Sequence, residues 1–490
     1  MSKTVSIIGA GIGGLATALR LAKLGFNVTI YEKNEQAGGR LNILKKDGFT
    51  FDVGPSFFSM SYVFKEFAEE CNINLPFEYY ELEPLYTVYF PGGRQYKIYK
   101  DIKRLAEQFS AVEPNFETSM KNYLASAKAL FDTSIKEVVG KNHESILDYL
   151  LSLMKNPFWQ LPKLFRNFYQ EVSKYFRAEE VRQIISLVAF FLGSTPFDTS
   201  AAYTILSYVE FQHDGYHNVK GGMYKIVEGF INELNKMGVK IIYNTEVVGA
   251  IKNKDLIEGL ITNSGEIIKS DYYVINADAA LFRARILKRK DFSEEKLRKM
   301  KWTFAPLTIY LGISGKIESL DHHNYFLGKN YRGYAEKIFK GEVPPEKPYY
   351  YVNVLSRNNP ECAPPGCETL FIVCPMPDLR FKPNWDDRDK IVDDIINDLS
   401  SRIGVNISER IISKTVYTPI EWAKKFNLYM GSGLGLAHNL KQMGYFRPKN
   451  KDEIYKNLFY VGASTTPGTG LPMCIISSKL VVERILKNKL

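Results

Sequence analysis

The chain has 490 residues, 45% of them hydrophobic and 24% charged, which is typical of a globular protein with a large core and excludes extensive disorder. The net charge of +10 has two explanations, a general excess of lysine or attraction to an anionic partner. Because the sequence has no zinc-finger spacing, basic heptad or arginine-rich tract, we expect no nucleic-acid partner, and a lipid surface remains as the anionic alternative.

The N-terminus begins with a lysine and an apolar stretch that superficially resemble a signal peptide. This stretch, MSKTVSIIGAGIGGLATALRLA, is too short and too rich in glycine to span a membrane, and the next most apolar run is only Ile184–Gly193. We therefore expect neither secretion nor a membrane-spanning helix. The five cysteines are odd in number and widely scattered, which indicates free thiols in a reducing, cytoplasmic compartment and no metal site.

The first element predicted is a buried strand, Val5–Ile8, followed by a glycine-rich turn and a helix. Gly9, Gly11 and Gly14 stand in the G-x-G-x-x-G spacing, with Gly13 in the same turn. The first glycine permits a tight turn and the second lets the backbone approach a pyrophosphate. The third allows close helix–strand packing, so that the N-terminus of the helix faces the phosphates. The pattern predicts a dinucleotide site.

A second strand, Val28–Tyr31, is predicted after this helix, and Glu32 ends it. An acidic side chain at this position accepts hydrogen bonds from an adenosine ribose. Gly38, Gly39 and Arg40 follow within eight residues of Glu32, and they add backbone donors and a cation beside the phosphates. An NAD fold does not need this second element. Here the chain resembles the flavoprotein superfamily of amine oxidases, protoporphyrinogen oxidases and carotene desaturases, which implies FAD as the cofactor.

Further along the chain, residues 218–280 contain a glycine turn, an amphipathic helix and apolar strands, a return to the same domain. In the superfamily that the chain resembles, this segment closes the FAD site, and Val247 matches a position whose backbone contacts the adenine. The stretch between, residues 96–214, is mainly helical in pattern and rich in aromatic residues.

Part of that helical stretch, SLMKNPFWQLPKLFRNFYQEVSKYFR, interleaves aromatic and basic residues. This pattern suits a segment lying in a membrane interface, and it equally suits a helix face packed on its own domain. The enzyme class that the chain resembles favours the membrane, and therefore a peripheral membrane protein.

The specific resemblance lies in five segments that occur in order along the chain: DGFTFDVGP, FLGSTPFDTSAAYTIL, APPGCETLFIVCPMPDL, YMGSGLGLAHNLKQMGYFRP and NLFYVGASTTPGTGLPM. Together they are similar to the bacterial-type phytoene desaturases, including the thirty-carbon diapophytoene (dehydrosqualene) desaturases, over nearly the whole chain. The resemblance implies an α/β fold, in which a Rossmann-like FAD-binding domain alternates with an α+β substrate domain. The expected segments are FAD-binding at 1–95, 215–290 and 429–490, a helical substrate and membrane part at 96–214, and a second substrate part at 291–428.

The C-terminal motif is the most specific of the five. The resemblance implies that Gly462 and Ala463 offer backbone to the phosphate and ribityl region of FAD. Residues Pro467–Met473 would then cross near the flavin ring. The family commonly has a histidine where this chain has Thr466, and a hydroxyl does not readily take a proton at neutral pH. This substitution leaves the exact product open.

The activity implied is removal of two hydrogens from adjacent carbons of a phytoene-type or diapophytoene-type polyene, with hydride transfer to the flavin and loss of a proton. Such a substrate has no hydrogen-bonding group, so we expect a long apolar tunnel. Electrons would leave to a quinone or to oxygen. The sequence offers no acid–base pair to nominate, and it leaves open the carbon number, the number of desaturation steps, the acceptor and the oligomeric state.

Other functions also fit parts of the sequence. A carotenoid isomerase or a terminal-methyl carotenoid oxidase would share these motifs, and an amine oxidase would share the cofactor site. The GDP-dissociation inhibitors bind prenyl lipid on the same fold without flavin. They would have a degraded phosphate site, whereas here the glycines, Glu32 and the Gly-Gly-Arg element are intact.

Overall fold

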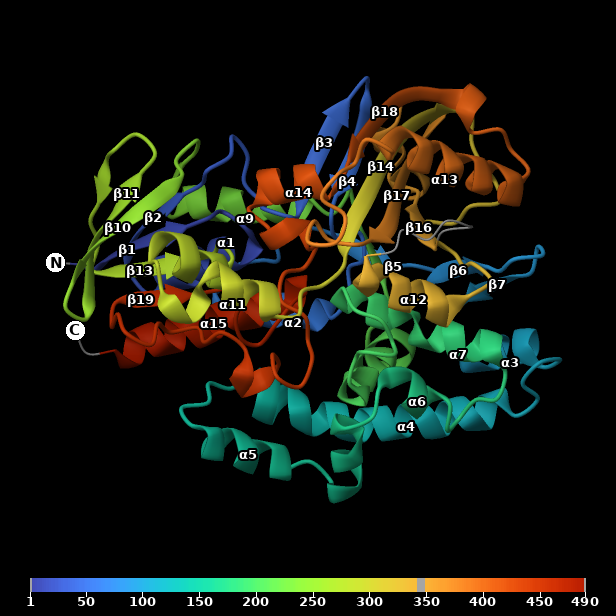
Figure 1. The fold of residues 1–490 in the computed structure, drawn as a ribbon, viewed down its shortest axis with the longest axis horizontal. Helices are drawn as coiled ribbons and strands as arrows, with labels where there is room; N and C mark the ends of the chain where they lie inside the picture. The colour runs from blue at the N-terminus through green and yellow to red at the C-terminus, as the bar shows by residue number, and fades with distance from the viewer. Residues whose placement is uncertain (1, 342–348, 489–490) are drawn as a thin grey trace.

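The computed structural model describes residues 2–341 and 349–488, and its first sheet is parallel, with strand order β19-β13-β1-β2-β9. The bounds of these strands are Thr4–Ile8 for β1, Asn27–Tyr31 for β2, Lys240–Ile242 for β9, Tyr272–Ile275 for β13 and Leu458–Tyr460 for β19. Three distant parts of the chain therefore build one sheet (Figure 1). Together with the helices around it, this sheet confirms the expected α/β class.

Both faces of the first sheet are buried because its strands alternate between two cores. On one face Ile7, Val274 and Phe459 join a core with α1 (Ile12–Lys23), α9 (Lys225–Lys236) and α15 (Leu471–Lys487). On the other face Ile8 and Tyr460 join a core with a small antiparallel sheet. The strands of that small sheet are β10 (Val247–Asn253), β11 (Leu256–Thr262) and β12 (Ile267–Ile268).

A second sheet of seven strands has the order β18-β14-β17-β16-β15-β6-β7. Its bounds are Tyr86–Tyr89 for β6, Gln95–Ile98 for β7, Ala305–Ser314 for β14, His323–Phe326 for β15, Tyr350–Asn353 for β16, Cys367–Met376 for β17 and Ile411–Tyr417 for β18. One face packs against α13 (Arg388–Ile403), which contributes Val392, Ile395 and Leu399 to the shared core. The five-segment division remains a prediction, and β6, from its first segment, pairs with β15 in this second sheet.

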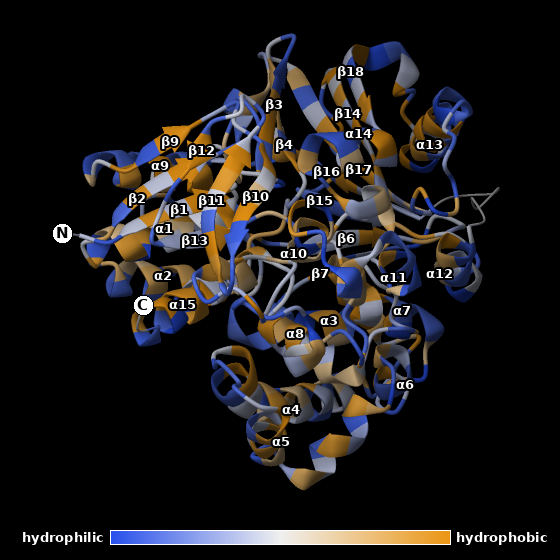
Figure 2. Ribbon diagram, turned by 60° about the vertical axis from the view of Figure 1, so that its left-hand side comes forward, coloured by the Kyte–Doolittle hydropathy of each residue, from blue (hydrophilic) through white to orange (hydrophobic). Residues whose placement is uncertain are grey.

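Helices from the middle of the chain lie together below the second sheet (Figures 1 and 2). They are α3 (Ile102–Phe109), α4 (Phe116–Ser134), α5 (Ile146–Met154), α6 (Phe168–Val172), α7 (Glu179–Ser186) and α8 (Ile205–Tyr208). The Asp101 side chain caps α3, and the Ser145 hydroxyl caps α5 by accepting from the Asp148 N–H. Among the described residues, no helix combines the length and the apolar content that crossing a bilayer requires.

The remaining regular elements connect these layers. They are β3 (Asn42–Lys46), β4 (Phe49–Val53), α2 (Ser61–Glu70), β5 (Tyr79–Glu81), β8 (His217–Val219), α10 (Ala279–Leu281), α11 (Glu294–Lys299), α12 (Tyr331–Lys340) and α14 (Pro419–Phe426).

Candidate cofactor and substrate site

The glycine loop between β1 and α1 forms one wall of a large cavity. Gly11 is the N-cap residue of α1 and has no side chain that could bond the N–H groups of the first turn. These N–H groups are therefore available to an anion. Gly14 lies behind the loop, where a Cβ atom would come 2.3 Å from the Gly9 carbonyl oxygen. Only glycine allows α1 to pack this closely on β1.

Glu32 follows β2 and is fixed by its own backbone surroundings. Its Oε2 accepts from the Ala10 N–H at 2.7 Å, and its Oε1 accepts from the Asn34 N–H at 3.0 Å. Burial raises the pKa of this carboxyl group, and the backbone hydrogen bonds oppose that rise. Each carboxylate oxygen keeps a further lone pair, which suits the hydroxyl groups of a ribose.

The Gly-Gly-Arg element runs beside the glycine loop. The Gly38 N–H donates to the Ala10 carbonyl at 2.8 Å, and the Gly38 φ of +111° is open to glycine but strained for other residues. Arg40 lines the cavity next to this turn, and its Nη1 donates to the Gly433 carbonyl at 3.3 Å. A positive charge therefore stands at the cavity wall, near Asp278 and Cys474.

The C-terminal motif lies against the glycine loop. The Val461 N–H donates to the Ile275 carbonyl at 2.9 Å, continuing the pairing of β13 with β19. Asn276 joins the two segments, because its Nδ2 donates to the Val461 carbonyl at 3.0 Å while its amide lies against Gly11 and Gly462. The Oδ1 atom of Asn276 is buried and has no hydrogen-bond partner among the described residues.

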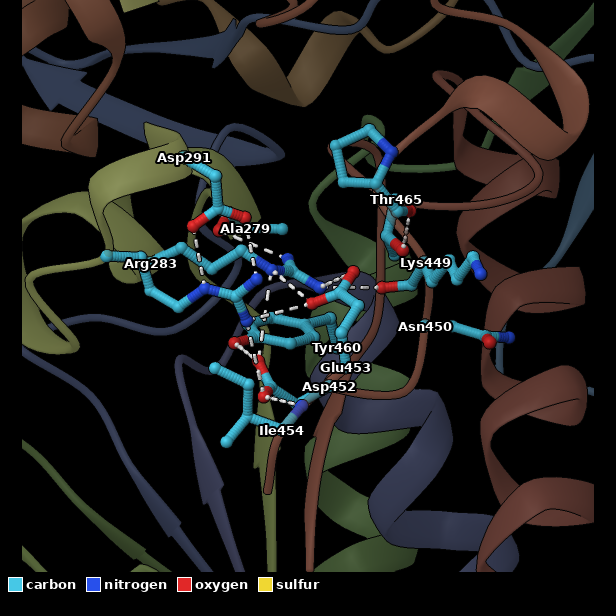
Figure 3. A network of polar contacts seen from close by, with 12 residues as sticks. Ala279, Arg283, Asp291, Lys449, Asn450, Asp452, Glu453, Ile454, Tyr460 and Thr465 are labelled. Carbon is cyan, nitrogen blue, oxygen red and sulfur yellow. Dashed lines mark hydrogen bonds and ion pairs between the residues drawn. The ribbon is translucent and has the colours of Figure 1, made fainter. Parts of the chain in front are cut away.

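Two buried arginines support this C-terminal segment, Arg447 at the turn itself and Arg283 at β19, the strand before it. Arg447 donates to the Ala463 carbonyl at 2.7 Å and to the Thr465 carbonyl at 3.1 Å. Arg283 stacks 3.7 Å above the Tyr460 ring and pairs with Glu453 at 3.2 Å (Figure 3). Arg447 lies in the family segment YMGSGLGLAHNLKQMGYFRP, but nothing in that segment indicates which carbonyl groups its guanidinium would bind, and Arg283 lies outside all five segments.

The cavity has a volume of about 670 Å³, within the range of ligand sites. It brings together most of the residues that the sequence nominated: Gly9, Gly11, Gly13, Glu32, Gly38, Gly39, Arg40, Val247, Ala463 and Met473 line it. Gly14 and Gly462 lie behind this lining, where they allow the close packing just described.

Beyond the polar end, the cavity continues between the second sheet and the middle helices. This part is mainly apolar and aromatic, with Phe57, Phe131, Leu187, Phe190, Phe191, Leu206, Phe304, Tyr325 and Tyr351 among its lining residues. Several of these rings contact Phe57, whose centroid lies 4.4 Å from Phe191 and 4.8 Å from Tyr216. An apolar ligand therefore fits this end of the cavity.

A second cavity of about 120 Å³ lies under α5 and the 3-10 turn Phe158–Leu164. It shares four wall residues with the large cavity: Val139, Tyr203, Ile205 and Pro467. Thr466 lines this second cavity, and its carbonyl accepts from the Ser477 hydroxyl. The imidazole that lines the large cavity is His438, whose Nε2 accepts from the Thr469 N–H at 3.1 Å.

The polar end fits a dinucleotide. Its donors are the N–H groups of the first turn of α1 and the Arg40 guanidinium, and its acceptors are Glu32 and the unpaired Oδ1 of Asn276. α15 adds a second helix N-terminus, because it begins after Gly470 without a side-chain cap. Donors for phosphate and an acceptor for ribose thus lie along one wall, and the apolar space begins next to them.

These features agree with a match to a family model. The chain belongs to the family of flavin-containing amine oxidoreductases, whose model matches residues 12–486. It is an oxidoreductase, and FAD is its cofactor.

Within that family the chain is similar to carotenoid desaturases. It is 32% identical to a zeta-carotene-forming phytoene desaturase of Myxococcus xanthus over 489 residues, covering 99% of this chain and 94% of the relative. It is 30% identical to a 4,4'-diapophytoene desaturase (4,4'-diaponeurosporene-forming) of Staphylococcus haemolyticus, covering 99% of each chain. A solved oxidoreductase structure from Methanosarcina mazei, at 16% identity, superposes with a TM-score of 0.63 over 98% of this chain and 100% of that chain, and supports the fold.

Proposed function

We propose that this protein is an FAD-dependent carotene desaturase, which introduces double bonds into a phytoene or diapophytoene type of polyene in carotenoid biosynthesis. The observation that carries this proposal is a single cavity with a dinucleotide-binding wall at one end and an aromatic channel at the other. The relatives include a phytoene desaturase and a diapophytoene desaturase, which supports this proposal.

The residues of this chain would bind and orient the two ligands. The first turn of α1 and Arg40 would hold the pyrophosphate, Glu32 the ribose, and the residues from Ala463 to Met473 the flavin end. The bound flavin supplies the acceptor for a hydride. The aromatic walls exclude water and align the polyene by shape, since it has no polar group to bind.

We also propose that the protein works at a membrane surface. Along α5 and the turn after it, large apolar side chains are exposed, including Leu147 (64%), Met154 (72%), Phe158 (78%) and Phe165 (82%). The second cavity lies directly beneath them and meets the large one at Tyr203. A lipid-dissolved polyene would gain a short apolar path to the site, and a membrane quinone or oxygen would take the electrons. Four aromatic or basic residues of that stretch, Lys163, Phe168, Tyr169 and Phe176, are buried and do not belong to this face.

The direct test uses purified protein in liposomes containing phytoene or diapophytoene. We expect flavin-dependent formation of products with longer conjugation, seen as a red shift in the polyene absorption. A change of isomer without a new double bond would instead identify an isomerase. Oxygen on a terminal methyl group would identify a methyl oxidase.

A further inference from the structure

Glu210 is a buried acid that faces the apolar part of the large cavity. Its exposed fraction is 2%, and it lies in the π-helical turn Val209–His213, a type of distortion found often at functional sites. The Tyr86 hydroxyl donates to its Oε1 at 2.6 Å, and Tyr216 makes a second hydrogen bond to it. A carboxyl group in such surroundings is costly to keep without a role.

A short series of contacts connects Glu210 to the cofactor wall. A Cβ on Gly54 would lie 2.3 Å from the Arg40 carbonyl, so the loop that follows β4 starts at the cofactor wall. Three residues later Phe57 reaches the aromatic part, where its ring packs 4.8 Å from Tyr216. Tyr216 in turn bonds Glu210. The acid is therefore linked through one short loop to the wall that would hold the cofactor.

The desaturation in the proposed function needs a group that accepts a proton. We propose that Glu210 is the catalytic base that removes this proton from the polyene. A hydride leaves one carbon for the flavin, and the adjacent carbon gives its proton to a Glu210 carboxylate oxygen. The electron pair of that second C–H bond becomes the new π bond. The two electrons on the flavin pass to the quinone or oxygen named above, and Glu210 then releases its proton.

The titration of Glu210 suits this role. Burial raises the pKa of Glu210 to about 8, while its two tyrosine hydrogen bonds oppose the rise. The titratable groups that face it are the phenols of Tyr86, Tyr123, Tyr216 and Tyr325, and burial raises the pKa of each of these. A base is most effective when its pKa lies near the working pH. Because Glu210 must be ionised to act, the rate should rise with pH through about 8.

The test compares wild-type holoenzyme with Glu210→Gln in liposomes containing phytoene or diapophytoene. The amide keeps the hydrogen bond from Tyr86 and cannot titrate. We expect both proteins to bind FAD with the same visible spectrum, and turnover of the variant to fall about a hundredfold at alkaline pH, with a flat pH profile. Infrared spectra should show a protonated carboxyl band that disappears through pH 8 in wild type and is missing from Glu210→Gln.

Asp52→Asn is the matched control. Asp52 is also a buried carboxyl group, and burial raises its pKa to about 7, but it accepts from the Met223 and Tyr224 N–H groups just before α9. Asparagine keeps one acceptor oxygen for these donors, and Asp52 does not line the cavity, so this variant should change the infrared spectrum while the rise in rate near pH 8 stays unchanged.

A second variant keeps the assignment testable if Glu210→Gln does not fold. Tyr86→Phe removes a hydrogen bond that lowers the pKa of Glu210, so the rise in rate should move from about pH 8 to higher pH. If wild type is active and Glu210→Gln has the same rates and pH profile, the role of Glu210 alone is overturned. The same conclusion follows if the rise in rate stays at the same pH in Tyr86→Phe. A wild type that desaturates neither polyene would overturn the proposed function and this role with it.

Discussion

Arg40 is the one charged side chain that the Gly-Gly-Arg element brings to the cavity wall, and its hydrogen bond to the Gly433 carbonyl at 3.3 Å holds it there. A guanidinium beside a phosphate makes charge-assisted hydrogen bonds, each contributing about 1.5–3 kcal/mol. Arg40→Ala should therefore weaken FAD binding about tenfold to a hundredfold, measured by titrating the apoprotein with FAD and following flavin fluorescence.

The control for this prediction is Arg94→Ala. Arg94 forms a surface ion pair with Glu180, and such pairs contribute little to stability. It should bind FAD as wild type does. Equal FAD affinity in wild type and Arg40→Ala would remove Arg40 from the phosphate site.

At the residue scale, the sequence predicted the site residues that stand in a known motif spacing, and it missed the site residues that stand outside one. Gly9, Gly11 and Glu32 stand in a known spacing that has a physical reason, so their places at the cavity follow from local sequence. Glu210 and Asn276 carry no such pattern. Their roles depend on segments far along the chain, such as Tyr86 for Glu210 and Val461 for Asn276.

Among the elements, the turn between β19 and α15 depends on Arg447. Its buried guanidinium donates to four carbonyl groups, those of Leu436, Gln442, Ala463 and Thr465. Arg447→Met keeps most of the volume and leaves these acceptors unpaired. We expect a loss of about 3–5 kcal/mol in the free energy of unfolding, measured by urea denaturation, and faster release of FAD.

Arg484→Met in α15 serves as the comparison, because the Arg484 guanidinium pairs with Glu144 and bonds Asn450 and His143, and binds no carbonyl group of the turn. It should cost much less stability and leave FAD bound. If both variants retain FAD equally well, Arg447 does not hold the turn.

The sequence predicted that the C-terminal motif belongs to the cofactor region. It did not predict which residues hold that motif in place. The motif is a dense cluster of glycine and hydroxyl residues that resembles a known family segment. Arg447 lies in another of the family segments, and Arg283 lies in none, but neither position indicates a partner in the sequence. Only the fold shows that Arg447, from the loop before β19, meets the turn, and that Arg283, from the π-helical turn Phe282–Ile286, stacks on Tyr460 of β19.

Over the whole molecule, the exposed apolar face of α5 and the turn after it lies at the end opposite β18 and α13 (Figure 1). If this face enters a bilayer interface, a charge on it should be costly. Phe158→Glu combined with Phe165→Glu should reduce binding to phosphatidylcholine vesicles at least about tenfold in a flotation assay.

Phe381→Glu combined with Ile412→Glu is the matched control, since these side chains are 44% and 53% exposed elsewhere on the surface. This control should float with vesicles as wild type does. Equal loss in both double variants would show that net charge, and not this face, governs binding.

At this largest scale the sequence predicted the fold class, but it could not give the order of strands in the second sheet. The β6 strand pairs parallel with β15, more than two hundred residues later, and no local signal specifies such a partner. The same limit applies to the cavity, because its aromatic walls come from β15, β16, the middle helices and the loop after β4. Tyrosine and phenylalanine are common in any core, so composition alone does not separate a channel from packing.

The position of β13 between β1 and β19 has a consequence for how the protein is made. During synthesis β13 is complete nearly two hundred residues before its neighbour β19 emerges from the ribosome. Until then one edge of a fully buried strand has no partner, and such an edge readily pairs with other chains. The N-terminal glycine loop also lacks the turn that faces it. The cofactor wall is therefore complete only once β19 and α15 have joined the elements built from the first part of the chain.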